Sequence, residues 1–189
     1  MRAFIKISIF LMLSLMVGMG IHAPERIAAQ EAKSPSLKAF YLYNLLLFVD
    51  WPENAFKKGD PLCIAVVGDD LLYQHLQRLS QKTVKRQKLE IRRIQDDEKW
   101  PQVCKVVFIG SSKRGLAPAL LTRLKKEPVL TVSDMPGFTR MGGMIRIKNL
   151  GVPASRTSKR FEINIDRMKQ RGLKIRARVL RLADIVYSP

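Results

Sequence analysis

The chain is poor in the residues that most often bind metal ions, because its 189 residues include only two cysteines and two histidines. A four-ligand zinc site of Cys and His would need all four of them, and His22 lies in an N-terminal segment that we expect to be removed. We therefore expect no metal site and no cofactor. Glycine and proline are also sparse, at 11 and 10 residues, which excludes collagen-like repeats and argues against disorder.

Acidic residues are the other shortage. The chain has 16 Asp and Glu against 34 Lys and Arg, which gives a formal net charge of +18. Basic residues concentrate in two segments, 82–93 and 167–181. Such clusters attract lipid phosphates, an acidic protein domain or nucleic acid, although a solvated helix face explains the second cluster equally well.

The N-terminus has the pattern of an export signal. Arg2 and Lys6 precede an uncharged run of about 15 residues, Ile7 to Ile21, which matches the charged and apolar regions of a secretory signal. The run is short for a membrane-spanning helix, which needs roughly 20 residues. We expect residues 1–29 to be a signal peptide cleaved after Ala29. Cleavage near Ala23 and retention as an uncleaved N-terminal anchor are the alternatives, and export argues against a nucleic-acid partner.

The remainder has the length of one domain, with an N-terminal linker over 30–36 and a folded domain over 37–187. Helical spacing and capping residues predict helices over 37–50 (capped by Ser36), 71–80 (capped by Asp69), 112–126 (capped by Ser111 or Ser112) and 175–186. Apolar or alternating runs predict strands over 62–67, 89–94 (at an edge), 103–109, 129–132, 143–147 and 160–165.

Two of the predicted strands, 62–67 and 103–109, end at a glycine and lead into a capped helix. Such βα units build parallel sheets. We therefore expect a single α/β domain of three layers, in which helices flank both faces of a mostly parallel sheet with Rossmann or flavodoxin-like topology.

The two cysteines fall at similar levels of these strands. Cys63 lies five residues before Gly68, and Cys104 lies six residues before Gly110. In a doubly wound sheet the two strands are neighbours, so a disulfide is within reach, and export supplies the oxidising compartment that it requires. Two buried free thiols are the alternative.

Five segments together resemble the YfiR-like family of small periplasmic proteins of Gram-negative bacteria. The resemblance covers about residues 37–186. The segments are KAFYLYNLLLFVDWP (38–52), LCIAVVGDD (62–70), VLTVSDMPGF (129–138), GGMIRI (142–147) and RFEINIDRMKQRGLKI (160–175).

The resemblance implies a periplasmic regulator without enzymatic activity, which binds the periplasmic part of an inner-membrane diguanylate cyclase or sensor kinase and represses its output. It also implies an outer-membrane lipoprotein as a second partner, and a homodimer is a further candidate assembly. Cys63 and Cys104 match one cysteine pair of the family. The second pair that some members carry is missing here from residues 144–160, so redox control through that pair does not carry over.

Six residues are candidates for a partner or ligand surface. Tyr43 and Trp51 form either an aromatic anchor for the first helix or part of a pocket. Phe138 lies beside a short loop, 139–141, that either touches a partner or simply connects strands. The other three candidates alternate along the predicted strand 160–165 and therefore share one of its faces: Arg160, Glu162 and Asn164. They form either an internal polar network or a surface that recognises a partner or ligand.

No catalytic constellation is visible. Gly110-Ser111-Ser112 superficially resembles a nucleophile elbow, but the GxSxG pattern requires glycine where Arg114 stands. His75 is the only histidine outside the expected signal peptide, and it lies in the middle of a predicted helix. Gly68-Asp69-Asp70 follows a strand without a phosphate-binding glycine motif, which favours helix capping.

The alternative function is a periplasmic domain that senses a small molecule and passes its occupancy to a membrane kinase or cyclase.

Overall fold

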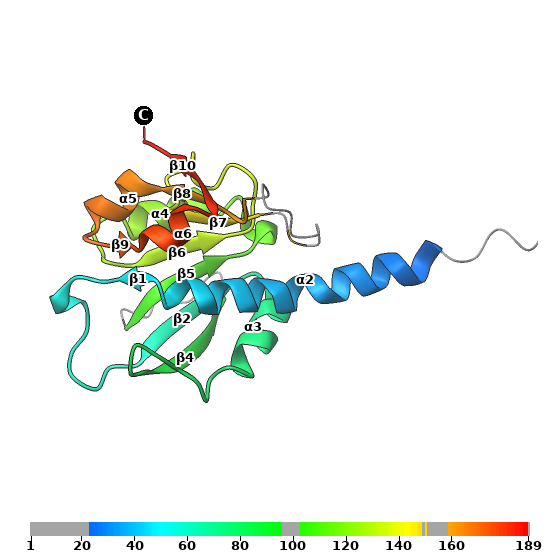
Figure 1. Cartoon of the computed structure of the whole chain (residues 1–189), viewed down its shortest axis with the longest axis horizontal. Coiled ribbons are helices and arrows are strands. Elements are labelled where there is room, and N and C mark those ends of the chain that lie inside the picture. Colours follow the sequence, from blue (N-terminus) through cyan, green and yellow to red (C-terminus); the bar gives the residue numbers. More distant parts are fainter. Residues whose placement is uncertain (1–22, 96–102, 149, 151–158, 189) are drawn as a thin grey trace, which may run out of the picture.

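An eight-stranded sheet forms the centre of the protein (Figure 1). The computed structural model describes residues 23–95, 103–148, 150 and 159–188. The strand order is β10-β8-β7-β6-β5-β2-β4-β3. The strands are β2 Leu62–Val67, β3 Thr83–Val84, β4 Gln87–Ile94, β5 Cys104–Ile109, β6 Leu130–Ser133, β7 Ile145–Ile147, β8 Phe161–Asn164 and β10 Ala183–Val186.

Most pairings in the sheet are parallel, and only β3–β4 and β7–β8 are antiparallel. A separate two-stranded sheet pairs β1 (Val49–Asp50) with β9 (Lys174–Ile175). The six residues of β2 are all buried, as expected for a strand with protein on both faces. The mostly parallel α/β sheet predicted from the sequence is confirmed.

Helices cover both faces of the sheet. One face packs against α2 (Ala23–Leu46), α3 (Asp70–Gln77), α5 (Ile165–Gln170) and α6 (Ala177–Leu180), and the other against α4 (Ala117–Arg123). Residues alternate between these faces along each strand, so Ile64 and Phe108 lie in the first core and Ala65 and Val107 in the second. Short 3-10 helices cover Glu53–Ala55 and Ser111–Lys113.

The direction of winding changes between β2 and β5. The chain leaves β2 through α3 on one face to reach β4, then returns to β5 and leaves through α4 on the other face to reach β6. Open α/β sheets bind ligands at such a switch point, outside the carboxyl ends of the strands. The loops after β2, β5 and β6 are therefore the first place to look for a site.

The first helix differs from the prediction of 37–50. Strong helix formers over 28–33 extend α2 toward the N-terminus, so Ser36 is not its cap, and its first turns project from the body (Figure 1). The helix ends at Leu46 because Val49 and Asp50 pair with β9. Among the described residues, no helix has the length and apolar character needed to cross a membrane.

The prediction of a C-terminal helix over 175–186 is wrong. Only Ala177–Leu180 are helical, and Ala183–Val186 form β10, which pairs with β8. The apolar residues of this segment fit both a helical and an alternating pattern. The segment becomes a strand because the edge of β8 is free to pair with it. The helix predicted over 112–126 is also divided, into a 3-10 turn and the shorter α4.

Candidate functional site

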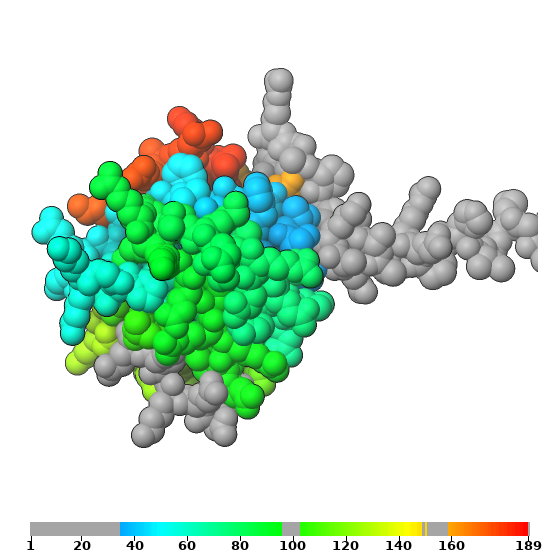
Figure 2. Space-filling view, turned by 90° about the horizontal axis from the view of Figure 1, so that it is seen from below, coloured from blue at the N-terminus to red at the C-terminus, as the bar shows by residue number. Residues whose placement is uncertain are grey.

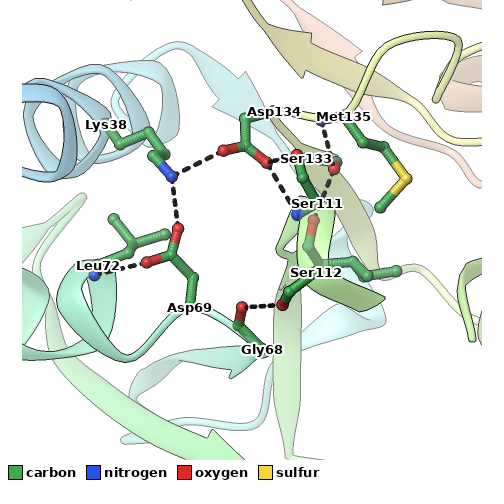
Figure 3. Close-up of polar contacts among 10 residues, drawn as sticks. Lys38, Gly68, Asp69, Leu72, Ser111, Ser112, Ser133, Asp134 and Met135 are labelled. Carbon is green, nitrogen blue, oxygen red and sulfur yellow. Dashed lines mark hydrogen bonds and ion pairs between the residues drawn. The ribbon is translucent and has the colours of Figure 1, made fainter. Parts of the chain in front are cut away.

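A buried lysine joins three parts of the fold at the switch point. Lys38 of α2 points its ammonium between the loops that follow β2 and β6 (Figure 3). Its Nζ lies 2.5 Å from Asp69 Oδ2 and 2.7 Å from Asp134 Oδ2. The residue is only 8% exposed. One cation thus holds two carboxylates from strand ends together beneath a helix.

The two carboxylates keep Lys38 charged. Burial disfavours the ammonium, but hydrogen bonds to Asp134 and Asp69 outweigh this cost and hold the pKa of Lys38 above its ordinary value. A lysine in this state donates hydrogen bonds and cannot accept a proton at neutral pH. It is therefore unsuited to act as a general base toward the neighbouring Ser111.

The carboxylates also organise the loops. Asp69 Oδ1 accepts a hydrogen bond from the backbone N–H of Leu72, 2.9 Å away, so Asp69 caps α3 as the sequence predicted. Asp134 Oδ1 accepts from the Ser111 hydroxyl at 2.7 Å and from the Ser111 N–H at 3.2 Å. The Ser112 hydroxyl donates to the carbonyl of Gly68. Neither serine caps a helix, contrary to the prediction, because both hydroxyls link neighbouring strand ends.

The loops after β2 and β5 touch directly. A Cβ on Gly110 would lie 2.5 Å from the carbonyl oxygen of Gly68, and a Cβ on Gly68 would lie 2.2 Å from Lys113 Cγ. Only glycine permits this approach, and Gly68 also has a φ of +71°. The centre of the switch point is thus filled by the protein's own groups.

A polar hollow of about 600 Å³ lies beside this filled centre, at the ends of β2 and β4. Arg93 on its wall forms an ion pair with Asp70, with Nε 2.9 Å from Oδ1. The described residues that line it are Gly68, Asp70, Arg93, Ile94, Gln95, Ser112 and Lys113.

A second hollow of about 410 Å³ lies between α2 and α3. Tyr43 lines it, half-buried, and its hydroxyl donates to the Thr83 carbonyl at 3.4 Å. Phe40 also lines it and is 58% exposed. We call this the α2–α3 groove; its described lining is Ser36, Ala39, Phe40, Tyr43, Asn44, His75, Arg78, Leu79 and Lys82.

Trp51 does not share that groove. It is half-buried, and its ring packs edge to face on Phe56 with the centroids 5.8 Å apart. The next residue, Pro52, lies against Gly172. The structure therefore places Trp51 where the chain turns after β1, in the position of an anchor, and separates it from Tyr43.

Phe138 is completely buried and belongs to the core beneath α4. Its ring fills the space above Gly143, where a Cβ would lie 2.2 Å from Phe138 Cε1. In the loop beyond it Thr139 is buried too, whereas Arg140 is exposed and Met141 is half-buried. Phe138 cannot touch a partner unless this packing opens.

The alternating residues of β8 do share one face, while Phe161 and Ile163 lie in the other core. Glu162 accepts a hydrogen bond from the Thr139 hydroxyl, and Asn164 Nδ2 donates to the Thr139 carbonyl at 3.2 Å. Asn164 also caps α5 by accepting from the N–H of Arg167. Arg160 and Asn164 are buried. Glu162 and Asn164 thus form an internal polar network with Thr139.

The predicted disulfide between Cys63 and Cys104 is present. The two residues are register partners at the start of β2 and β5, and both are completely buried. The bond lies at the opposite end of these strands from Lys38, so it braces the sheet far from the switch point.

Three features of this site, Lys38, Asp134 and the linking role of Ser111, were not predicted from the sequence. A charged residue directly before the buried Ala39 of an apolar helix face was the available signal for Lys38. Asp134 comes directly after β6, and Asp69 comes two residues after the end of β2. Because both follow the carboxyl end of a parallel strand, these positions would have placed both carboxylates at the same edge of the sheet.

Comparison with known proteins agrees with the resemblance. No curated protein matches the chain. The YfiR/HmsC-like family matches it over residues 35–184, from α2 into β10. The chain therefore belongs to the YfiR/HmsC-like family.

Proposed function

We propose that this protein is an exported, non-enzymatic signalling regulator that binds the periplasmic part of an inner-membrane diguanylate cyclase or sensor kinase and represses its output. Family membership supports this class of function. The observation that carries the proposal is the closed switch point, where Lys38, Asp69 and Asp134 satisfy one another and the Gly68 and Gly110 loops are in contact. The position where related folds bind substrates serves here to hold α2.

Export agrees with a disulfide that is completely buried, since such bonds persist in oxidising compartments. We place the protein in the periplasm, with residues 1–29 as its signal peptide. An uncleaved N-terminal anchor would leave the domain in the same compartment.

The surface that we assign to the membrane partner is the α2–α3 groove. One wall of this groove is α2, the helix that Lys38 fastens to the strand ends, and the exposed ring of Phe40 lies on that wall. Aromatic side chains in a hollow often dominate the free energy of protein binding. Movement of α2 relative to α3 would change the shape of the groove.

The test is genetic and biochemical. Deletion of the gene should raise cellular cyclic-di-GMP, and the wild-type copy should restore the low level. A Phe40→Glu copy should fail to restore it, whereas Leu71→Glu should succeed, because Leu71 is equally exposed at 55% but does not line the groove. Unchanged cyclic-di-GMP after deletion would remove the cyclase as partner and leave the kinase, which phosphotransfer assays with and without the protein would test.

The polar hollow beside the switch point favours a second candidate function, a sensor of a small molecule. Its volume of about 600 Å³ and the cations Arg93 and Lys113 suit a small anion. A screen of anionic metabolites should then find one that raises the melting temperature of the wild type and has no effect on Arg93→Gln. A screen without such a compound would leave the regulator as the single candidate.

A further inference from the structure

Residues 174–181, which begin in β9 and end just after α6, present four basic side chains to solvent, and the acidic residue that follows them, Asp184 of β10, is paired with Lys148. Lys174, Arg176, Arg178 and Arg181 are all exposed, and no acidic residue lies between them. We call these four residues the C-terminal basic face. Among the described residues, no side-chain hydrogen bond or ion pair is formed by Lys174, Arg178 or Arg181, so their charges are not neutralised locally.

A shared carboxylate joins this face to the other basic segment of the sequence. Asp50 of β1 lies 3.5 Å from Arg176 Nε and also pairs with Lys85 in the turn between β3 and β4. The two basic segments, 82–93 and 167–181, therefore meet in space at Asp50, although Lys85 and Arg176 are 91 positions apart in the chain. One aspartate between two cations leaves this surface positive.

Exposed apolar side chains follow these basic residues directly in the chain. The described part of the chain has five exposed large hydrophobic residues, and three of them belong to β10 or its ends: Leu182, Ile185 and Tyr187. Tyr187 is 68% exposed. The neighbouring Ser188 N–H donates to Asp166 Oδ2 at 3.0 Å, which holds the end of the chain against α5. In Figure 2 this red segment lies at one edge of the molecule, next to the cyan residues that follow α2.

We propose that this edge of the protein, the C-terminal basic face with Leu182, Ile185 and Tyr187, binds a membrane surface rich in anionic phospholipid. Unpaired Lys and Arg side chains attract lipid phosphates, and exposed Leu, Ile and Tyr side chains enter the interfacial region. The cations lie on β9, on α6 and on the two residues that flank α6, and they line neither of the two hollows described above. A fluid array of phosphates matches that arrangement better than one fixed acidic side chain does.

Such binding does not depend on the proposed regulatory function, because it needs only lipid. If the protein does regulate an inner-membrane partner, lipid binding would concentrate it in the plane of that partner and raise its effective concentration.

Sedimentation with vesicles tests the proposal. The processed protein, recovered from the periplasm of an expression host, is mixed with vesicles of phosphatidylglycerol and phosphatidylcholine or of phosphatidylcholine alone. We expect binding to the mixed vesicles, weakening with added salt, and none to phosphatidylcholine. The triple variant Lys174→Gln, Arg178→Gln, Arg181→Gln should bind at least about tenfold more weakly, since each basic residue near an anionic surface contributes roughly a fivefold factor in affinity.

A matched control removes the same charge elsewhere. Arg123, Lys125 and Lys126 are exposed at the end of α4, on the opposite face of the sheet. The triple Arg123→Gln, Lys125→Gln, Lys126→Gln has the same net charge and should bind within about twofold of the wild type. The double variant Leu182→Ser, Tyr187→Ser should lose most of the binding that remains at high salt. Thermal melts check that every variant is folded.

Two results would overturn the proposal. Equal losses in the two triple variants would mean that net charge alone, and not this face, attracts the vesicles. A wild type that ignores phosphatidylglycerol yet binds polyglutamate through the same three residues would assign the face to an acidic protein.

Discussion

Lys38 Nζ lies 2.7 Å from Asp134 Oδ2, although 96 residues separate them in the chain. The same ammonium pairs with Asp69, so a single side chain of α2 fastens the ends of β2 and β6. The helix is held at this point by charge as well as by the apolar packing of Leu42, Leu45 and Leu46.

Removal of the ammonium should therefore destabilise the fold. Lys38→Met leaves Asp69 and Asp134 close together without a cation, and we expect the free energy of unfolding to fall by about 2–4 kcal/mol. The exposed Lys125→Met should change it by no more than about 0.5 kcal/mol. Urea unfolding followed by circular dichroism measures both. Equal effects in the two variants would mean that Lys38 contributes nothing specific.

The charge of Lys38 should also make the free energy of unfolding depend on pH. Because its folded pKa is raised, the stability from the ammonium is complete below 10.5, the ordinary pKa of lysine, and is lost as the pH rises through the higher folded value. The stability difference between wild type and Lys38→Met should thus be constant near neutral pH and shrink at higher pH. Urea titrations from pH 8 to 11.5 measure it, and a difference that grows with pH would contradict the assignment.

Local signals predicted part of this site and missed the rest. The apolar runs of β2 and β5 specify buried strands, and an aspartate before an apolar helical repeat specifies the cap of α3. Ser111 offers the same capping signal, yet its hydroxyl binds Asp134. That choice depends on a residue 23 positions away, so no local pattern contains it.

The structure of the C-terminal segment also depends on contacts that a local sequence pattern does not contain. Leu180, Ala183 and Val186 have helical spacing, but Ala183 and Val186 pair with Phe161 and Asn164. Pairing with an existing strand edge outweighs the weak local preference of a short segment. The buried position of Phe138 is also nonlocal, since the ring belongs to the core beneath α4.

The contact between Phe138 and Gly143 gives a further prediction. Gly143→Ala would place a Cβ 2.2 Å from a ring that is completely buried, and overpacking of this kind should lower stability by about 1–3 kcal/mol. Gly115→Ala is the control, because nothing lies within 4 Å of its Cβ position, and it should remain within about 0.5 kcal/mol of the wild type. Thermal melting compares them. An undisturbed Gly143→Ala would show that the ring of Phe138 has room to move.

The disulfide should contribute to stability and resist reduction in the folded state. It joins residues 41 positions apart, and closing such a loop stabilises the fold by about 4 kcal/mol on a chain-entropy estimate. Cys63→Ala with Cys104→Ala should lose about that amount, with or without reductant, whereas the wild type should lose it only in reductant. Because both sulfurs are inaccessible, reduction should proceed at the rate of unfolding, so that mild urea accelerates it sharply. Mass spectrometry after alkylation follows the reaction, and rapid alkylation of the native protein without reductant would show that the bond is not formed in solution.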